Sequence, residues 1–353
     1  MYDDCVGKKP ASYPTSLSAS IMRVKRFSKV WLPAGLAVVL GACHLLVGVE
    51  DRSSGVADAG ALPLEDARNP VDAVVMDAPP PPLPDAAPDA GVCGPNLPFG
   101  SPIPLVGVNT VGGEFAVTLS NDEREVFVTT STQDGLKPAV YRSTRASLDT
   151  SFVPPSLVEL DVPLPHWGVS LAPNGLDLYV SAGARPRRLY RTRRPTASDP
   201  FQPSEVVQIA PSPVGMLFDN PYVTGRGVLY MTRESGPQFD IYFSFLDDAG
   251  AYGIPRSLAA FNTVGTSEDW PVESTDGKTL FFASGGLAST EIIEARRAFP
   301  TDAYSTGKPL TFPQAAVKHP GWISVDGCRL YLVMENAPGG RGGADVFVAQ
   351  RGR

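Results

Sequence analysis

Hydrophobic and polar positions alternate in short runs over residues 97–353, and these runs recur at a nearly constant interval. The same eight-residue pattern ends in an aromatic residue five times, with spacings of 52, 51, 51 and 50 residues. The five aromatic residues are Phe127, Tyr179, Tyr230, Phe281 and Tyr331. Such regularity along the chain predicts an internal structural repeat.

Each repeat carries the signals of four short strands. A turn pair, as at Asn174-Gly175, Asp276-Gly277 and Asp326-Gly327, precedes an alternating apolar run that predicts a strand. A further strand is predicted after that run, at 140–145, 189–194, 240–245, 291–296 and 345–350. Another is predicted just before the turn, as at 271–274 and 322–325. The fourth is predicted at 104–108, 157–161, 206–210 and 258–262.

Four antiparallel strands per repeat predict an all-β fold, a β-propeller of about five four-stranded blades. A propeller leaves no blade edge bare if it closes into a ring, so the strand at 104–108 is expected to complete the last blade. A kelch array has a similar period. It would need paired glycines at one register, and the pairs Gly112-Gly113, Gly285-Gly286 and Gly339-Gly340 do not share one.

The repeats resemble the TolB-like, WD-like propeller repeat over residues 100–351. The fourth repeat matches at Pro271, Ser274, Asp276, Gly277, Leu280, Phe281, Phe282 and Ser284, then at Glu291, Ile292 and Arg297. The fifth matches at Ser324, Asp326, Gly327, Leu330 and Tyr331, then at Asp345, Val346, Phe347 and Arg351. The third departs most, with Gly225 at the turn and Leu246 in place of the arginine. The resemblance implies a β-propeller and protein contact, and no single chemistry.

Residues 22–43 have the design of an export signal. Four basic residues precede an apolar run of 11 residues, 30–40, which is too short to span a bilayer. The run ends in Leu40-Gly41-Ala42-Cys43, which resembles the lipobox of bacterial lipoproteins, and this resemblance implies that Cys43 carries the lipid. An ordinary signal peptide or a signal anchor is the alternative. Residues 1–21 fit no signal design, so Met22 is the expected start.

Residues 56–91 consist largely of Ala, Pro, Asp and Val, with a four-proline run at 79–82. Such a segment buries too little apolar surface to offset its ordering entropy, so we expect an extended, disordered tether. The predicted organisation is therefore a signal region at 1–42, a lipidated linker at 43–96 and the propeller at 97–353.

The composition excludes several functions. The net charge of −7 offers no basic field, so nucleic acid is a poor partner. None of the four cysteines lies in a CxxC pair, so we expect no zinc site, no other metal and no cofactor. Export into an oxidising compartment favours a disulfide between Cys93 and Cys328, which a closed ring would bring into one blade. The alternative is two free thiols.

Catalytic motifs are lacking. None of the three histidines follows a nucleophile elbow, and the sequence contains no HExxH, P-loop or GxGxxG motif. The stretch 274–281 resembles a sialidase Asp-box but lacks its tryptophan, and it is interpreted as a turn. Acidic residues at blade starts are interpreted as structural partners of the strand-end arginines Arg145, Arg194, Arg297 and Arg351. Their alternative role is paired catalytic carboxylates in the channel.

One set of residues is predicted to ring a mouth of the central channel, seven or eight positions before the turns. The candidates are Glu114, His166, Trp167, Glu268, Asp269, Trp270 and His319. Polar groups beside aromatic rings suit a peptide or sugar ligand, whereas the alternative is that the tryptophans belong to the core between blades.

The sequence therefore favours an envelope lipoprotein whose propeller is a non-enzymatic binding module. Its expected partners are an envelope protein, peptide or glycan and, through the lipid anchor, a membrane. A monomer is expected, at the outer membrane and facing the periplasm or the surface, with the leaflet left open. The alternative function is an envelope glycan hydrolase or lyase.

Overall fold

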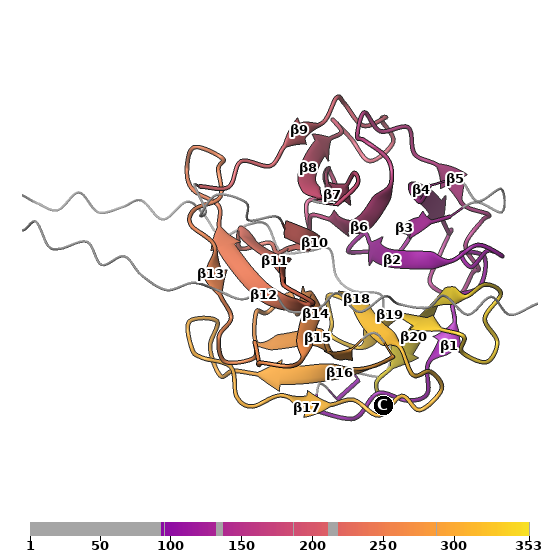
Figure 1. Ribbon diagram of the computed structural model, residues 1–353. Helices are drawn as coiled ribbons and strands as arrows, with labels where there is room; N and C mark the ends of the chain where they lie inside the picture. Colours follow the sequence, from indigo (N-terminus) through magenta and orange to yellow (C-terminus); the bar gives the residue numbers. More distant parts are fainter. Residues whose placement is uncertain are drawn as a thin grey trace, which may run out of the picture. The chain divides into compact units, whose positions relative to one another are not determined.

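The computed structural model describes residues 93–94, 96–131, 137–185, 187–210, 218–286 and 288–352. These residues form five four-stranded antiparallel sheets arranged as the blades of a β-propeller (Figure 1). The prediction of five blades is confirmed. The predicted signal region, Cys43 and the proline-rich tether lie outside the described residues. None of the described residues forms a helix long and apolar enough to cross a membrane.

The strands of each blade follow one another outward from the channel. Blade 1 contains β2 (Glu114–Leu119), β3 (Glu125–Thr130), β4 (Ala139–Thr144) and β5 (Ser156–Leu157). Blade 2 contains β6 (His166–Leu171), β7 (Asp177–Ala182), β8 (Arg188–Arg193) and β9 (Glu205–Val206). Blade 3 contains β10 (Phe218–Val223), β11 (Val228–Ser235), β12 (Gln238–Phe245) and β13 (Arg256–Ser257). Blade 4 contains β14 (Ser267–Glu273), β15 (Thr279–Gly286), β16 (Ser289–Arg296) and β17 (Lys308–Pro309).

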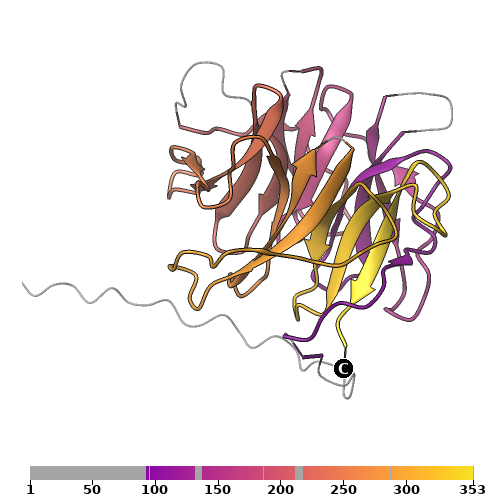
Figure 2. The same ribbon diagram turned by 60° about the horizontal axis from the view of Figure 1, so that its bottom comes forward.

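Blade 5 is built from both ends of the described chain. It contains β18 (Lys318–Ile323), β19 (Arg329–Glu335), β20 (Ala344–Gln350) and, at its outer edge, β1 (Ile103–Pro104). Ile103 pairs with Val348 and Pro104 with Phe347, so an N-terminal strand completes the last blade as predicted (Figure 2). It covers Ile103–Pro104, whereas the sequence predicted 104–108.

The outer strands differ from their prediction. Each contains only two residues, and β5, β9 and β13 end before or early within the runs predicted at 157–161, 206–210 and 258–262. Apolar residues of those runs pack inward instead, as Leu160 and Phe261 do against the core clusters. Very short edge strands leave little unpaired backbone for another chain to bind.

The hairpin between the first and second strand of each blade fixes one face of the propeller, here called the turn face. Its glycines at 175, 227, 277 and 327 have φ angles of 68–72°. In blade 1, Glu123 occupies the equivalent position with a φ of 57°. Glycine adopts this region without a Cβ clash, which explains the Asn-Gly and Asp-Gly pairs in the repeat. The opposite face, where the first strands begin, is called the channel mouth.

An aromatic residue that follows the third strand of each blade covers the preceding blade. The pairs are Phe152 with Tyr331, Phe201 with Phe127, Tyr252 with Tyr179, Tyr304 with Tyr230, and Phe99 with Phe281. Phe99 belongs to the N-terminal segment and supplies the residue that the last repeat lacks. The ring is therefore closed by side-chain packing as well as by strand pairing.

The arginine at the end of the third strand joins this aromatic residue to the turn. The guanidinium groups lie 3.9–5.1 Å from the ring centroids of Phe152, Phe201, Tyr304 and Phe99. The donors are the Nε atoms of Arg145, Arg194, Arg297 and Arg351, and they bond the carbonyls of Glu123, Gly175, Gly277 and Gly327. Blade 3 has Leu246 in place of the arginine. Here the backbone of Leu246 forms a β-bridge with Tyr252, the aromatic residue of this blade.

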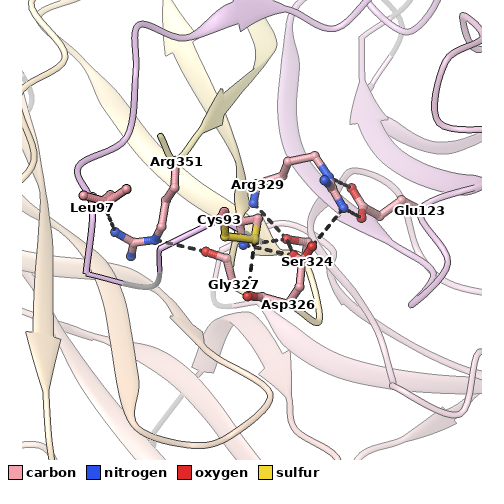
Figure 3. The surroundings of a disulfide bond; sticks show 9 residues. Cys93, Leu97, Glu123, Ser324, Asp326, Gly327, Arg329 and Arg351 are labelled. Carbon is pink, nitrogen blue, oxygen red and sulfur yellow. Dashed lines mark hydrogen bonds and ion pairs between the residues drawn. A yellow bond between two sulfur atoms is a disulfide. The ribbon is translucent and has the colours of Figure 1, made fainter. Parts of the chain in front are cut away.

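A disulfide joins Cys93 to Cys328, the pairing that the sequence predicts, with Cα atoms 6.0 Å apart (Figure 3). Cys328 follows the Asp326-Gly327 turn, so the bond lies on the turn face. Beside it, Arg351 donates to the carbonyls of Leu97 and Gly327 at 2.6 and 3.0 Å (Figure 3). The start of the described chain is thus held to the last blade at several points.

Candidate functional site

The sequence-predicted residues divide into two groups at the channel mouth. Glu114, His166 and Glu268 occupy the same position of three first strands, eight residues before Asp122, Asn174 and Asp276 of the turns, and each is at most 3% exposed. The side chains of Glu114 and Glu268 bond their own blade and the segment that leads into it, whereas His166 of blade 2 bonds Val140 of blade 1. The three side chains therefore hold blades and connections together and do not present polar groups to the channel.

Glu114 is the most perturbed of these acids. Its Oε1 accepts hydrogen bonds from the hydroxyls of Thr110 and Thr130 at 2.7 and 3.1 Å, while the buried Oε2 has no partner among the described residues. Burial raises the pKa of the Glu114 carboxyl to about 7, with a smaller contribution from the charge of Asp345. A protonated carboxyl suits this surrounding, because it leaves no unpaired buried charge.

His166 and Glu268 are satisfied in the same way. The Nδ1 of His166 accepts from the Val140 amide at 3.2 Å, and its Nε2 lies 3.2 Å from the Val162 carbonyl. Burial lowers the pKa of His166. Glu268 accepts from Thr263 and Ser284, and burial raises its pKa.

The expected pairing of these acids with the strand-end arginines is wrong. Arg194 and Arg297 bind Glu125 and Glu273, and Arg351 binds Glu294. The physical reason is the direction of the third strand, which runs from the channel mouth to the turn face. The arginine at its end therefore lies at the opposite end of the blade from Glu114 and Glu268.

Replacing Glu114 by glutamine should flatten the pH dependence of stability. A carboxyl with a raised folded-state pKa binds its proton more tightly than the unfolded chain, so its stability contribution is complete below about pH 4.5 and lost as the pH rises to about 7. Between those pH values the free energy of unfolding of the wild type should therefore fall by about 3 kcal/mol relative to that of Glu114→Gln. Chemical denaturation at several pH values measures this difference.

The control for this prediction is Glu159→Gln at an exposed position. Its stability difference from the wild type should stay the same over that pH range. A Glu114→Gln difference that is equally constant would contradict the prediction.

The next position along the first strands forms a ring at the mouth. Its members lie seven residues before that turn position: Phe115, Trp167, Asp219, Asp269 and His319. All but Asp219 are partly exposed. Three of the sequence-predicted residues, Trp167, Asp269 and His319, are therefore brought to one level of the channel.

A register shift lies at or just after this ring position in every first strand. In blades 3 and 4 the residues at the shift, Asn220 and Trp270, have φ angles of 46° and 54°. Bulges of this kind redirect a side chain. Trp270 stacks on His319, with ring centroids 4.0 Å apart, and packs on the apolar cluster between blades 1 and 2. It thus spans from blade 4 to the other side of the channel.

An ion pair lies beside Trp167. Arg187, from the connection that precedes β8, binds the carboxylate of Asp219, and its guanidinium lies 4.4 Å from the Trp167 ring centroid. Burial lowers the pKa of Arg187 to about 10, which leaves it charged at neutral pH. Stacking on an aromatic face and pairing with a carboxylate fix the plane of the guanidinium.

Asp269 is held by the neighbouring blade. Its Oδ1 accepts from the Asn220 amide group at 2.8 Å and from the Trp270 backbone amide at 2.7 Å. Burial raises its pKa. A Cβ at Gly168 would lie 2.9–3.0 Å from Asn220, so glycine is required for this close approach.

We call Trp167, Arg187, Asp219, Asn220, Asp269, Trp270 and His319 the mouth cluster. The sequence did not identify Arg187, Asp219 or Asn220. Arg187 comes from a hairpin connection outside the repeat signature, and blade 3 is the repeat with the weakest match. The sequence signal available was the Asp219-Asn220-Pro221 triplet, in which a proline inside a predicted strand indicates a bulge. Among the described residues, no cluster of acidic, histidine or cysteine side chains is suited to a metal ion.

Trp322, a tryptophan of the strand predicted at 322–325, does not lie in the mouth cluster. It is 5% exposed and packs edge-on against Tyr331, with ring centroids 5.7 Å apart. For this residue the core interpretation is confirmed.

A groove of about 570 Å³ lies at the seam between blades 5 and 1, away from the mouth cluster. Arg145, Arg329 and Tyr331 line it, and the last two hydrogen-bond Glu123. Its polar groups are already satisfied by each other. It therefore offers less to orient a ligand than the mouth cluster does.

Solved structures with partial similarity to this chain include two glycoside hydrolases and a TolB protein. A thermostable family-43 glycoside hydrolase is 14% identical and has a TM-score of 0.49, with 71% of this chain and 92% of that chain covered. A family 117 glycoside hydrolase from Zobellia galactanivorans is 9% identical, with a TM-score of 0.48 and coverages of 72% and 90%. TolB from Acinetobacter baumannii is 13% identical, with a TM-score of 0.38 and coverages of 73% and 55%.

No family model matches the sequence, and no curated protein matches it. The similar structures include both TolB and glycoside hydrolases, so they do not decide between a binding module and an enzyme. A fold supports many functions, and the function has to be argued from the residues of this chain.

Proposed function

We propose that this chain is a bacterial cell-envelope lipoprotein, anchored through Cys43, whose propeller is a non-enzymatic binding module. The observation that carries the proposal is the mouth cluster, in which aromatic and charged side chains of four blades converge on one end of the channel. Trp167, Asp269, Trp270 and His319 remain partly exposed there. Partly exposed aromatic faces beside fixed polar groups are typical of ligand sites.

The position of the disulfide supports this arrangement. Cys93 is bound to Cys328 on the turn face, whereas the mouth cluster lies where the first strands begin, at the other end of the channel. A tether that joins the propeller at Cys93 would present the mouth cluster away from its attachment. Such an orientation suits a module displayed from a membrane.

The bonds of the carboxylates favour binding over hydrolysis. A glycosidase needs one carboxyl to donate a proton and a second to act as base or nucleophile. Asp219 is engaged by Arg187, and Asp269 by Asn220 and the Trp270 amide. Each carboxylate is occupied by neighbouring donors, which suits a fixed recognition surface.

Capture from envelope extracts tests the proposal, with the full-length lipidated chain as bait. Cys43→Ser should move from the membrane fraction to the soluble fraction, because it removes the thiol that accepts the lipid. In the capture step, Trp167→Ala should not retain the ligand that the wild type retains, because the variant lacks the aromatic ring on which the Arg187 guanidinium stacks. Mass spectrometry of the eluate identifies what is retained.

Lys278→Ala, at an exposed position on the turn face, is the matched control and should capture as the wild type does. Equal capture by the wild type, Trp167→Ala and Lys278→Ala would contradict binding at the mouth cluster. Cleavage of the captured ligand during incubation would favour the hydrolase. Membrane retention of Cys43→Ser would refute the lipid anchor.

A further inference from the structure

The groove at the seam between blades 5 and 1 has exposed apolar walls. Three of its lining residues, Ile103, Val106 and Leu148, are 63%, 66% and 47% exposed. Its volume of about 570 Å³ lies within the range of roughly 300–1,000 Å³ that is usual for binding sites. Large aliphatic side chains gathered around one hollow expose apolar surface to water, and such surface marks an interaction site.

The charged groups of the groove compensate one another. Arg329 donates to both carboxylate oxygens of Glu123, and Arg145 lies 4.0 Å from the same carboxylate. A second acid, Asp149, also lines the groove. Two positive and two negative charges leave no excess of either sign, so the groove favours an uncharged, apolar occupant.

The segment that forms one wall disfavours a β-strand as the occupant. Pro102 and Pro104 lie in this wall on either side of Ile103, and proline has no backbone N–H to donate to an added strand. The occupant must then be held by its side chains. A polyproline II segment suits this wall, because its conformation contains no internal backbone hydrogen bonds and it binds apolar grooves through its side chains.

The chain carries a segment of this composition shortly before the propeller. Residues 81–84 read Pro-Pro-Leu-Pro, and they contain no charged residue. Leu83 is the only large apolar residue in the stretch 77–91. It lies ten positions before Cys93.

The disulfide fixes the end of this stretch beside the groove. The Cα atom of Cys93 lies 6.0 Å from that of Cys328, whose neighbour Arg329 lines the groove (Figure 3). Since consecutive Cα atoms are about 3.8 Å apart, Cys93 is within about 10 Å of Arg329. Ten residues of polyproline II span about 31 Å, so Leu83 can reach the groove from Cys93.

A short connection also lowers the affinity that such a contact needs. A segment joined by a short linker has an effective concentration of a few mM at its site. A dissociation constant of about 0.5 mM would then keep the groove occupied most of the time. A few aliphatic contacts are enough for such an affinity, because the disulfide has already placed the segment.

We propose that the groove binds the segment 81–84 of the same chain, with Leu83 against Ile103, Val106 and Leu148. This contact goes beyond the binding function proposed above and does not depend on it. It covers the exposed apolar walls and holds the end of the tether across the seam where the ring closes.

Hydrogen exchange of the full-length chain tests the inference. Backbone amides at 101–106 and 148–152 should exchange at least about threefold faster in Leu83→Ser than in the wild type, because the groove loses its occupant. A synthetic peptide of residues 78–92, added in the millimolar range, should restore slow exchange in Leu83→Ser. It should not do so in the double variant Leu83→Ser, Val106→Ser, in which the groove has also lost an apolar wall.

The matched control is Leu64→Ser, the same change in the same tether but 29 positions before Cys93. It should exchange as the wild type does. Equal exchange in Leu83→Ser and the wild type overturns the inference, and so does a peptide that fails to slow the exchange of Leu83→Ser. Slow exchange of the wild type that is lost on dilution would assign the groove to a second copy of the chain and overturn the contact within one copy.

Discussion

Replacing Arg194 by alanine should lower the free energy of unfolding by about 3 kcal/mol or more. This guanidinium is 1% exposed and binds both oxygens of Glu125, at 2.8 and 2.5 Å. It also donates to the Gly175 carbonyl and lies over Phe201. The variant would remove from the buried Glu125 carboxylate and from the Gly175 carbonyl the donors that Arg194 supplies. Arg142 remains beside Glu125, which places the expected loss toward the lower end of the range for broken buried pairs.

The matched control is Arg185→Ala. Arg185 also pairs with a glutamate, Glu234, but both side chains are about half exposed, at 55% and 46%. Its removal should cost no more than about 1 kcal/mol. Denaturant unfolding of the two variants measures the difference. If Arg194→Ala lowers the free energy of unfolding no more than about 1 kcal/mol, as expected for Arg185→Ala, then this strand-end arginine does not stabilise the contact between its blades.

Removing the disulfide with Cys93→Ala and Cys328→Ala should lower the free energy of unfolding by up to about 5.5 kcal/mol. The two cysteines are 235 positions apart, so the bond restricts a very long loop of the unfolded chain. The value is an upper estimate, because residual structure in the unfolded chain reduces the entropy that the bond removes.

Thermal unfolding with and without a reductant measures this contribution. The melting temperature of the wild type should fall when the reductant is added. The double variant should melt at that lower temperature with and without the reductant. A wild type that is insensitive to complete reduction would show that the bond contributes nothing to stability.

The blades were predictable because their signals are local. An Asp-Gly pair fixes a hairpin within four residues, and the alternation that follows fixes which face is buried. Ring closure was predictable as well, since the fifth repeat ends after its third strand and a spare strand precedes the first. The two-residue outer strands were not, because their apolar residues pack inward and the sequence does not show where pairing stops.

The mouth cluster was predictable only in part. Trp167, Asp269 and His319 occupy a repeat position and could be found by counting back from the turn. Arg187 could not, because it reaches the cluster from a connection outside the repeat signature. The bulge that sends Trp270 across the channel depends on backbone geometry, and a tryptophan with a positive φ has no sequence signature.

The disulfide also determines how the propeller carries a mechanical load. A pull on the chain ahead of Cys93 passes through the sulfur bridge into Cys328, between β18 and β19. The alternative covalent path runs through Phe99 to β1, whose hold on β20 is only two residue pairs. Because the bridge lies ahead of that segment, the closing strand is kept out of the line of force. The inner hairpin of blade 5, paired along its length, bears the tension instead.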